Sequence, residues 1–61
     1  MKLMTINQTI EKYPAFTQGG LRHLIFYKKV NGIGTAIIRV GRRIYFEEEA
    51  LEKWLEAQRD K

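Results

Sequence analysis

One stretch constrains the fold of this chain more than any other: residues 36–46, Ala-Ile-Ile-Arg-Val-Gly-Arg-Arg-Ile-Tyr-Phe. Two apolar, β-branched runs, 36–38 and 44–46, flank a short turn signal. Gly41 can take the positive φ that a tight hairpin turn needs. The stretch therefore predicts a two-stranded antiparallel ribbon. An isolated ribbon is only marginally stable in water, so the rest of the chain must cover its apolar face.

The tip of this ribbon is strongly basic. Alternation places Ile38 and Val40 on one side of the first strand, and Ile37 and Arg39 on the other. The three arginines that fall within five residues at the tip are Arg39, Arg42 and Arg43. Such a cluster is hard to explain by solubility alone, and it indicates a polyanionic partner.

Length and composition limit the remaining choices. The chain has 61 residues and no cysteine, which excludes a disulfide framework and a cysteine zinc site. We therefore expect one domain over residues 1–61, stabilised by a core of Leu, Ile, Phe, Tyr and Trp. No apolar run approaches the roughly 18 residues of a membrane span, and no signal-peptide pattern is evident. These features predict a soluble, cytoplasmic protein.

Charge is distributed unevenly along the sequence. Residues 1–27 carry a net +2, residues 28–43 carry five cations and no acid, and residues 44–61 carry a net −3. The total of +4 thus hides a basic centre and an acidic end. A basic segment in a small domain is typical of a nucleic-acid-binding protein.

Two short helices are predicted before the ribbon. The first begins after the N-cap Thr5, spans about residues 6–12 and ends at Pro14. The second begins after the N-cap Thr17 and spans about residues 18–29. The apolar residues predicted to face inward are Ile6, Ile10 and Tyr13 on the first helix and Leu21, Leu24 and Ile25 on the second. Two helices joined by about four residues match the helix-turn-helix spacing.

The outer face of the second helix carries the candidate readers of DNA. It presents Gln18, Gly19, Arg22, His23 and Phe26. Gln18 is a plausible adenine reader and Arg22 a plausible contact to guanine or phosphate. His23 has no companions for a metal site, which leaves a phosphate or base contact or a solvated side chain. Phe26 either touches a thymine methyl or packs under the following loop, and the second alternative is favoured.

The glycine pair Gly19-Gly20 has one functional interpretation and two structural ones. Glycine inside a helix costs about 1 kcal/mol relative to alanine. It would be retained for a close approach of the helix to a phosphate or groove wall, for close packing on the first helix, or simply because a first turn tolerates it.

A turn and a third helix complete the chain. Asn31-Gly32 predicts the end of the second helix, with Gly32 in the left-handed region. The acids at 47–49 suit a helix N-terminus, and the third helix runs from there to about Gln58, with residues 59–61 fraying. Its inner stripe is Leu51, Trp54, Leu55 and Gln58. Trp54 is expected to fill the core between this helix, the ribbon and the first helix.

The predicted order is helix, turn, helix, two-stranded wing and C-terminal helix, an α+β, mostly helical winged helix-turn-helix. The chain resembles the small excisionase-type DNA-binding proteins. The segments that carry the resemblance are Thr5-Ile6, Phe16-Thr17-Gln18, the 38–46 wing and Glu49-Ala50-Leu51-Glu52-Lys53-Trp54-Leu55. These are related to the winged-helix domain of MerR-type regulators and to AlpA-type prophage regulators. The resemblance covers about residues 4–56. The chain departs from it at Tyr13-Pro14 and Gly19-Gly20.

The resemblance implies a sequence-specific double-stranded DNA-binding protein of a phage or mobile element. Such proteins bend DNA, assist an integrase in excision as recombination directionality factors, and bind side by side with further copies of themselves. By this resemblance the second helix enters the major groove, and its candidate contacts are Thr17, Gln18, Gly19, Arg22 and His23. The wing and its flank, with Lys28, Lys29, Arg39, Arg42 and Arg43, meet the backbone or the adjacent minor groove.

The sequence also bears on other functional classes. An enzyme is not expected, because the chain offers no cluster of catalytic residue types, and no metal, cofactor or small-molecule substrate is implied. An AlpA- or MerR-like transcriptional regulator remains an alternative on the same fold. A phage adaptor or inhibitor that binds a host protein through the acidic third helix is the alternative without DNA. RNA binding is weaker, because the ribbon has no aromatic stacking platform.

Overall fold

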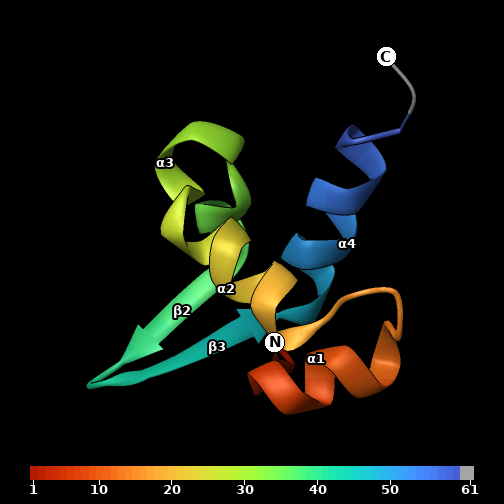
Figure 1. Ribbon diagram of the computed structural model, residues 1–61. Helices are drawn as coiled ribbons and strands as arrows, with labels where there is room; N and C mark the ends of the chain where they lie inside the picture. Colours follow the sequence, from red (N-terminus) through yellow and green to blue (C-terminus); the bar gives the residue numbers. More distant parts are fainter. Residues whose placement is uncertain (60–61) are drawn as a thin grey trace.

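The structure, a computed structural model, describes residues 1–59 and forms a small α+β fold (Figure 1). Residues 60–61, for which fraying was expected, lie outside the described residues. In chain order the elements are β1 (Leu3–Met4), α1 (Ile6–Lys12), α2 (Gln18–Phe26), α3 (Lys28–Asn31), the 3-10 turn η1 (Ile33–Ala36), β2 (Ile37–Val40), β3 (Arg43–Glu47) and α4 (Glu48–Ala57).

The predicted hairpin is confirmed. Val40 pairs with Arg43, so Gly41 and Arg42 form a two-residue turn between β2 and β3. Gly41 has φ 61°, and no other residue of the turn has a positive φ. A positive φ at the first central residue alone is typical of a type II′ turn, whose twist matches that of the strands. The hairpin extends beyond the helices (Figure 1).

The sheet has a third strand that the sequence did not predict. β1 pairs antiparallel with β3, with Leu3 opposite Glu47 and Met4 opposite Phe46, and the strand order is β1-β3-β2. The predicted two-stranded hairpin is thus part of a three-stranded sheet. A strand of two residues is too short to show alternation, and only its pairing with β3 defines it.

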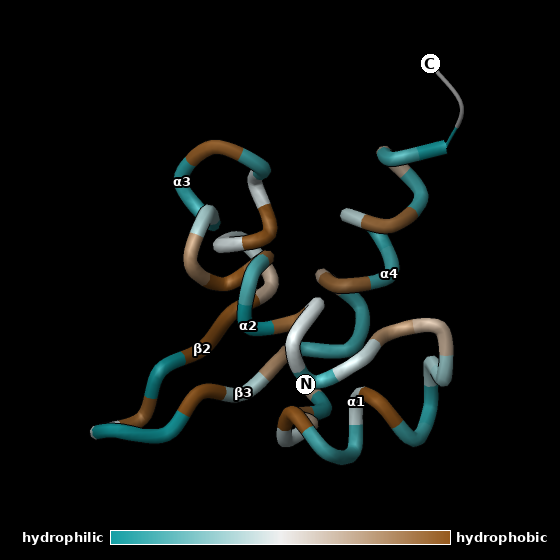
Figure 2. The backbone as a smooth tube through the Cα atoms, in the orientation of Figure 1, coloured by the Kyte–Doolittle hydropathy of each residue, from teal (hydrophilic) through white to brown (hydrophobic). Residues whose placement is uncertain are grey.

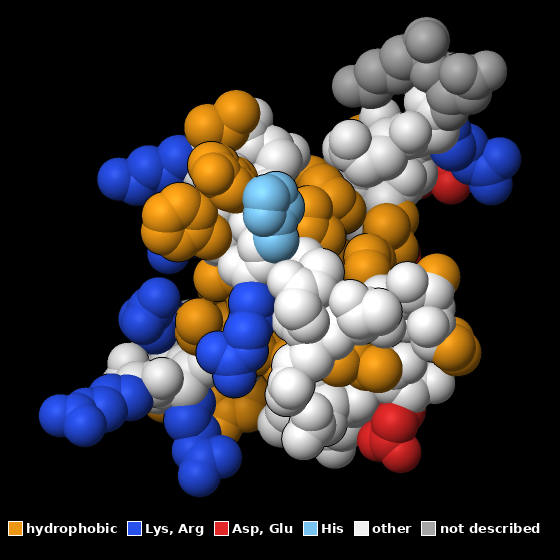
Figure 3. Space-filling model, viewed as in Figure 1, with side chains coloured by type: hydrophobic (Ala, Val, Ile, Leu, Met, Phe, Trp, Pro, Cys, Tyr) orange, Lys and Arg blue, Asp and Glu red, His pale blue; other side chains and the backbone are white. Residues whose placement is uncertain are grey.

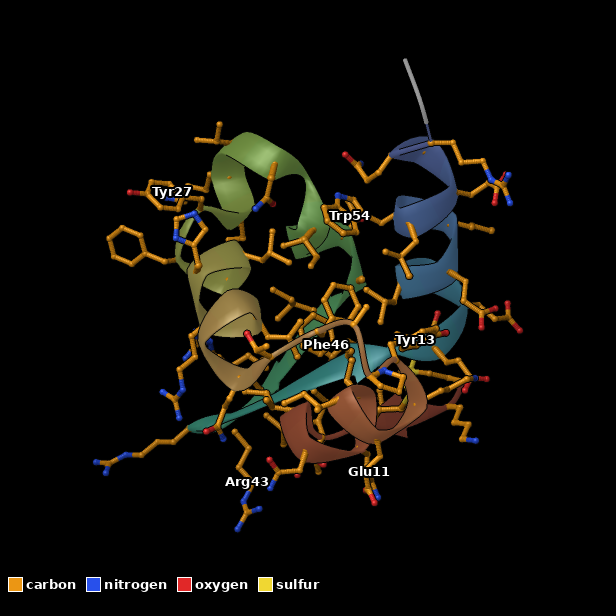
Figure 4. All side chains as sticks on the ribbon, turned by 45° about the vertical axis from the view of Figure 1, so that its right-hand side comes forward. Glu11, Tyr13, Tyr27, Arg43, Phe46 and Trp54 are labelled. Atoms are coloured by element: carbon orange, nitrogen blue, oxygen red, sulfur yellow. The ribbon has the colours of Figure 1, made fainter. Side chains whose placement is uncertain are left out.

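One face of the sheet forms the core. Residues directly opposite each other project to the same face, so Met4, Phe46 and Ile37 lie on one side. Phe46 is the largest fully buried side chain, and it lies between the sheet and the helices (Figure 4). The other fully buried apolar residues are Leu21, Ile33, Ala36 and Leu51. The hydrophobic segments of β2 and β3 give way to hydrophilic residues at the hairpin end (Figure 2).

Both predicted helix starts are confirmed. The Thr5 hydroxyl accepts from the Gln8 N–H at 3.1 Å, and the Gln8 side chain accepts from the Thr5 N–H at 3.0 Å. This reciprocal capping box satisfies two N–H groups that a helix end leaves free. Thr17 caps α2 in a simpler way, accepting from Gly20 N–H at 2.9 Å. The α1 bounds agree with the prediction, and Tyr13 terminates it before Pro14.

The second helix ends earlier than predicted. α2 stops at Phe26, Tyr27 leaves the helical conformation, and α3 begins at Lys28. Asn31 accounts for the break, because its side-chain amide donates to Leu24 O at 3.0 Å and its Oδ1 accepts from Ile33 N–H at 2.9 Å. In a continuous helix the Lys28 N–H would bond that Leu24 carbonyl. The turn brings Ile33 into the core.

The C-terminal helix packs differently from the expectation. Leu51 is fully buried, as predicted, but Trp54 is half-buried against the α3–η1 turn (Figure 4). Its Nε1–H donates to Asn31 O at 2.8 Å, and its ring lies beside Gly32, whose φ of 82° confirms the predicted left-handed turn. Phe46, rather than Trp54, fills the centre. Gln58, expected on the inner stripe, is exposed and follows the end of α4.

Ion pairs join α1 to α4. Lys12 pairs with Glu48 and lies 3.6 Å from Glu52, while the Tyr13 hydroxyl donates to Glu52 at 2.8 Å. Hydrogen bonding to Glu48 raises the pKa of Lys12, and the same bond lowers the pKa of Glu48. Among residues 1–59, no helix is long and apolar enough to cross a membrane.

Candidate nucleic-acid interface

The outer face of α2 carries a row of three side chains. Gln18, Arg22 and Phe26 are spaced four residues apart, so they lie on one side of the helix, and all three are exposed. Gln18 and Arg22 thus lie on the outer face of the helix, as the sequence predicts. The structure contradicts the favoured alternative for Phe26, because this side chain is 79% exposed and not covered by the following loop.

A groove joins this row to the hairpin. It consists of two shallow hollows that share Ile6 and Ile44, one between α1, α2 and β3 and the other along α2. We call it the α2–β3 groove. Its polar residues include Gln18, Arg22 and Arg43, its apolar residues include Ile6, Ile25 and Ile44, and Phe26 lines the hollow that also contains Arg22. The structure therefore brings candidate residues of α2 and of the hairpin to one surface.

The hairpin arginines are exposed but point in different directions. Arg39 is opposite Ile44, on the face of the sheet that carries the core, whereas Arg43 is opposite Val40 on the other face. Arg42 lies in the turn. Arg43 nevertheless lines the α2–β3 groove and projects outward from the hairpin (Figure 4). The three guanidinium groups surround the hairpin end rather than forming one cluster.

Thr17, Gly19 and Gly20 have different environments in the structure. The Thr17 hydroxyl is engaged as the helix cap, so this residue has a structural role. A Cβ at Gly20 would lie 3.0 Å from the Thr17 Oγ1, whereas a Cβ at Gly19 would meet no atom within 4 Å. Packing around the cap explains Gly20. Nothing within the described protein requires glycine at position 19, where the helix surface is open to a close approach.

His23 and the two flanking lysines have local contacts of their own. The His23 ring lies 4.7 Å from the Tyr27 ring, centroid to centroid. Lys28 and Lys29, predicted in the last turn of helix 2, belong instead to α3. Lys28 is half-buried, with its stem against Gly34, and Lys29 is exposed. The break at Tyr27 thus separates these two lysines from the axis of α2.

The side of the molecule with α4 differs in charge from the side with α2, α3 and the hairpin. The ion pairs within residues 1–59 all use acids of α4, joined to Lys2, Lys12 or Arg59. Six cations outside α4 have no acidic partner in that range: Arg22, Lys28, Lys29, Arg39, Arg42 and Arg43. Figure 3 shows most visible Lys and Arg side chains on the side of α2, α3 and the hairpin, and the visible acids on the opposite side.

The apolar part of this surface is larger than the sequence indicated. Phe26, Tyr27 and Val30 are 79%, 45% and 86% exposed, and the Phe26 and Tyr27 rings meet edge to face at 5.0 Å. The spacing of Phe26 from Gln18 and Arg22 was visible in the sequence. Its exposure was not, because an aromatic residue near a loop more often packs against that loop.

Comparison with protein-family models, with curated proteins and with solved structures gave no match. Within residues 1–59, no three or more His, Asp or Glu side chains gather where they could hold a metal ion. Function is therefore inferred from the α2–β3 groove and the charges around it.

Proposed function

We propose that this protein binds double-stranded DNA as a winged helix, with α2 in the major groove and the β2–β3 hairpin as the wing. One observation carries the proposal: within residues 1–59, six cations of α2, α3 and the hairpin have no acidic partner, and two of them, Arg22 and Arg43, line the α2–β3 groove. Unpaired positive charges repel one another and so destabilise an isolated domain. They strengthen binding to a polyanion, because each contact with a phosphate releases counterions.

The division of roles follows from the chemistry of the side chains. Gln18 and Arg22 offer the amide and guanidinium groups that pair with adenine and guanine edges in the major groove. Arg39, Arg42 and Arg43 surround a narrow hairpin end, which suits the minor groove or the phosphates that flank it. The open surface at Gly19 would let the first turn of α2 approach the DNA backbone.

The finer proposal is that of an excisionase-type architectural factor. A base-reading helix and a basic wing on one side would contact DNA over both grooves, which favours bending. An integrase and further copies of this chain would then be its partners. A transcriptional regulator would use the same surface. An excision assay with an integrase, run with and without this chain, distinguishes the two roles.

A protein-binding function has one observation of its own. The exposed side chains of Phe26, Tyr27 and Val30 form an apolar surface beside the cations, and exposed apolar surfaces often mark protein contacts. This alternative predicts that duplex binding is weak and does not depend on the hairpin arginines.

The decisive experiment is a salt titration of binding to a labelled duplex, followed by fluorescence anisotropy. Each phosphate contact adds about one unit to the slope of log affinity against log salt. Replacing Arg42 and Arg43 together with alanine should weaken binding to all duplexes and flatten the slope by about two units. Both side chains are exposed, so the fold should survive, which circular dichroism checks.

Lys53→Ala is the matched control, because Lys53 is an exposed cation on the acidic helix α4. It should leave the slope of log affinity against log salt unchanged. A folded double variant with the affinity and slope of the parent would exclude the hairpin from a DNA interface and favour the protein-binding alternative.

A further inference from the structure

Phe26 is an aromatic side chain in an energetically unfavourable, solvent-exposed position. Its ring is 79% exposed, so most of its apolar surface stays in contact with water. It is also oriented, because it meets the Tyr27 ring edge to face, at 5.0 Å and an interplanar angle of 82°. Edge-to-face contacts are favourable and directional. The protein thus presents a solvent-exposed aromatic ring in a defined orientation at its surface.

The position of this ring connects it to the proposed DNA site. Phe26 continues the row of Gln18 and Arg22, one helical turn beyond Arg22. It lines the same hollow as Arg22 and Ile44. A helix that presents Gln18 and Arg22 to base edges would present Phe26 to the same groove, about two turns from Gln18.

The chemistry of the ring selects one kind of base edge. In the major groove, guanine, cytosine and adenine present hydrogen-bond donors and acceptors, and only thymine adds an apolar C5-methyl group. Phenylalanine has no donor or acceptor, so a contact with the other base edges would desolvate polar atoms without replacing their hydrogen bonds. A contact with a thymine methyl would remove apolar surface from water on both sides.

We propose that Phe26 reads thymine, its ring contacting the C5-methyl group in the major groove next to the base or phosphate that Arg22 contacts. This inference rests on the proposed DNA-binding function and specifies part of its sequence preference. It assigns the thymine contact to one side chain of α2 and to one substituent of one base.

The test removes only that methyl group. Duplexes retained by the protein are first selected from a randomised pool, and each thymine of the selected site is then replaced in turn by deoxyuridine. Loss of one buried methyl is worth about fourfold in affinity, so the parent should bind about fourfold more weakly when the contacted thymine is replaced. In Phe26→Ala, binding to the thymine duplex should fall, and the difference between thymine and deoxyuridine should vanish at that position.

Two variants make the result specific. Phe26→Leu keeps an apolar side chain and should retain part of the methyl dependence. Val40→Ala removes an exposed apolar side chain of the hairpin and should retain all of it. Because Phe26 is largely exposed, Phe26→Ala should fold, which circular dichroism and thermal melting verify.

The outcomes separate this inference from the function on which it rests. If the pool yields no retained duplex, DNA binding and the reading of thymine are both overturned. If duplexes are selected but no thymine methyl matters, or if Phe26→Ala keeps the parent's methyl dependence, only the assignment of Phe26 is overturned.

Discussion

At the scale of single residues, the adjacent glycines Gly19 and Gly20 have opposite environments. A Cβ at position 19 would meet no atom of the protein within 4 Å, whereas a Cβ at position 20 would lie 3.0 Å from the cap hydroxyl of Thr17. Glycine in the middle of a helix costs about 0.5–1 kcal/mol relative to alanine, and this is the upper limit for Gly19, the second residue of α2. No contact inside the described protein offsets this cost at position 19.

Alanine at each of these two positions should have a different effect. Gly19→Ala should stabilise the protein by at most about 0.5–1 kcal/mol. It should at the same time weaken duplex binding, because the added methyl occupies the surface proposed to approach DNA. Gly20→Ala should gain no such stability, since it disturbs a cap that is worth about 0.5–2 kcal/mol. Thermal melting and anisotropy of both variants provide the comparison. A Gly19→Ala protein that is more stable and binds as tightly as the parent would exclude a close approach there.

At the scale of elements, the contact between α1 and α4 titrates. The hydrogen bond from Lys12 lowers the pKa of Glu48 below its ordinary value of 4.5. A carboxyl group with a lowered pKa in the folded state stabilises the fold above its unfolded pKa. That contribution is lost as the pH falls through the folded value. Lys12 acts in the opposite range: its pKa is raised above 10.5, so its contribution is lost only as the pH rises beyond that value.

The lowered pKa of Glu48 should make the stability of the protein depend on pH in the acid range. Glu48→Gln should lower the melting temperature at neutral pH, and the gap to the parent should close as the pH falls below about 4.5. Glu49→Gln is the matched control, because Glu49 lies in the same first turn of α4 and is exposed. Melting curves from pH 2 to pH 7 provide the measurement. A gap that stays constant over this range would mean that the Lys12–Glu48 pair contributes nothing to stability.

The helix starts and the hairpin were predictable because their signals are local. Thr5 and Thr17 cap the helices that follow them, and Gly41 forms the hairpin turn within the residues that encode it. The break after Phe26 was not predictable, since it depends on the Asn31 side chain reaching back to Leu24.

The third strand and the position of Trp54 could not be predicted from the sequence for the same reason. β1 exists only through its pairing with β3, and Trp54 is placed by its hydrogen bond to the Asn31 carbonyl. Both are contacts between residues far apart in the sequence. For the candidate site, the polarity of the α2 face and the basic hairpin could be predicted. Their meeting around Ile6 and Ile44 required the tertiary structure.

At the scale of the whole molecule, stability and the candidate site depend on one small core. The α2–β3 groove is lined by α1, α2 and β3, and these elements meet around Phe46. A chain of 61 residues has a total stability of about 3–9 kcal/mol. Replacing a buried phenylalanine with alanine costs about 3–5 kcal/mol. Phe46→Ala should therefore leave the molecule largely or marginally unfolded, with all elements lost together.

Because the fold depends on this core, refolding of a destabilised variant can be used to detect DNA binding. A ligand that binds only the folded state adds about 2.7 kcal/mol of stability at a hundredfold excess over its dissociation constant. If DNA contacts α2 and the hairpin at once, a selected duplex should restore helical circular dichroism to Phe46→Ala in a single transition. The same variant with Arg42 and Arg43 also replaced by alanine should recover less signal at equal duplex concentration, because it retains fewer phosphate contacts. A Phe46→Ala protein that melts like the parent would contradict the central role of Phe46. Refolding to the same extent with and without the two arginines would show that DNA does not use the hairpin.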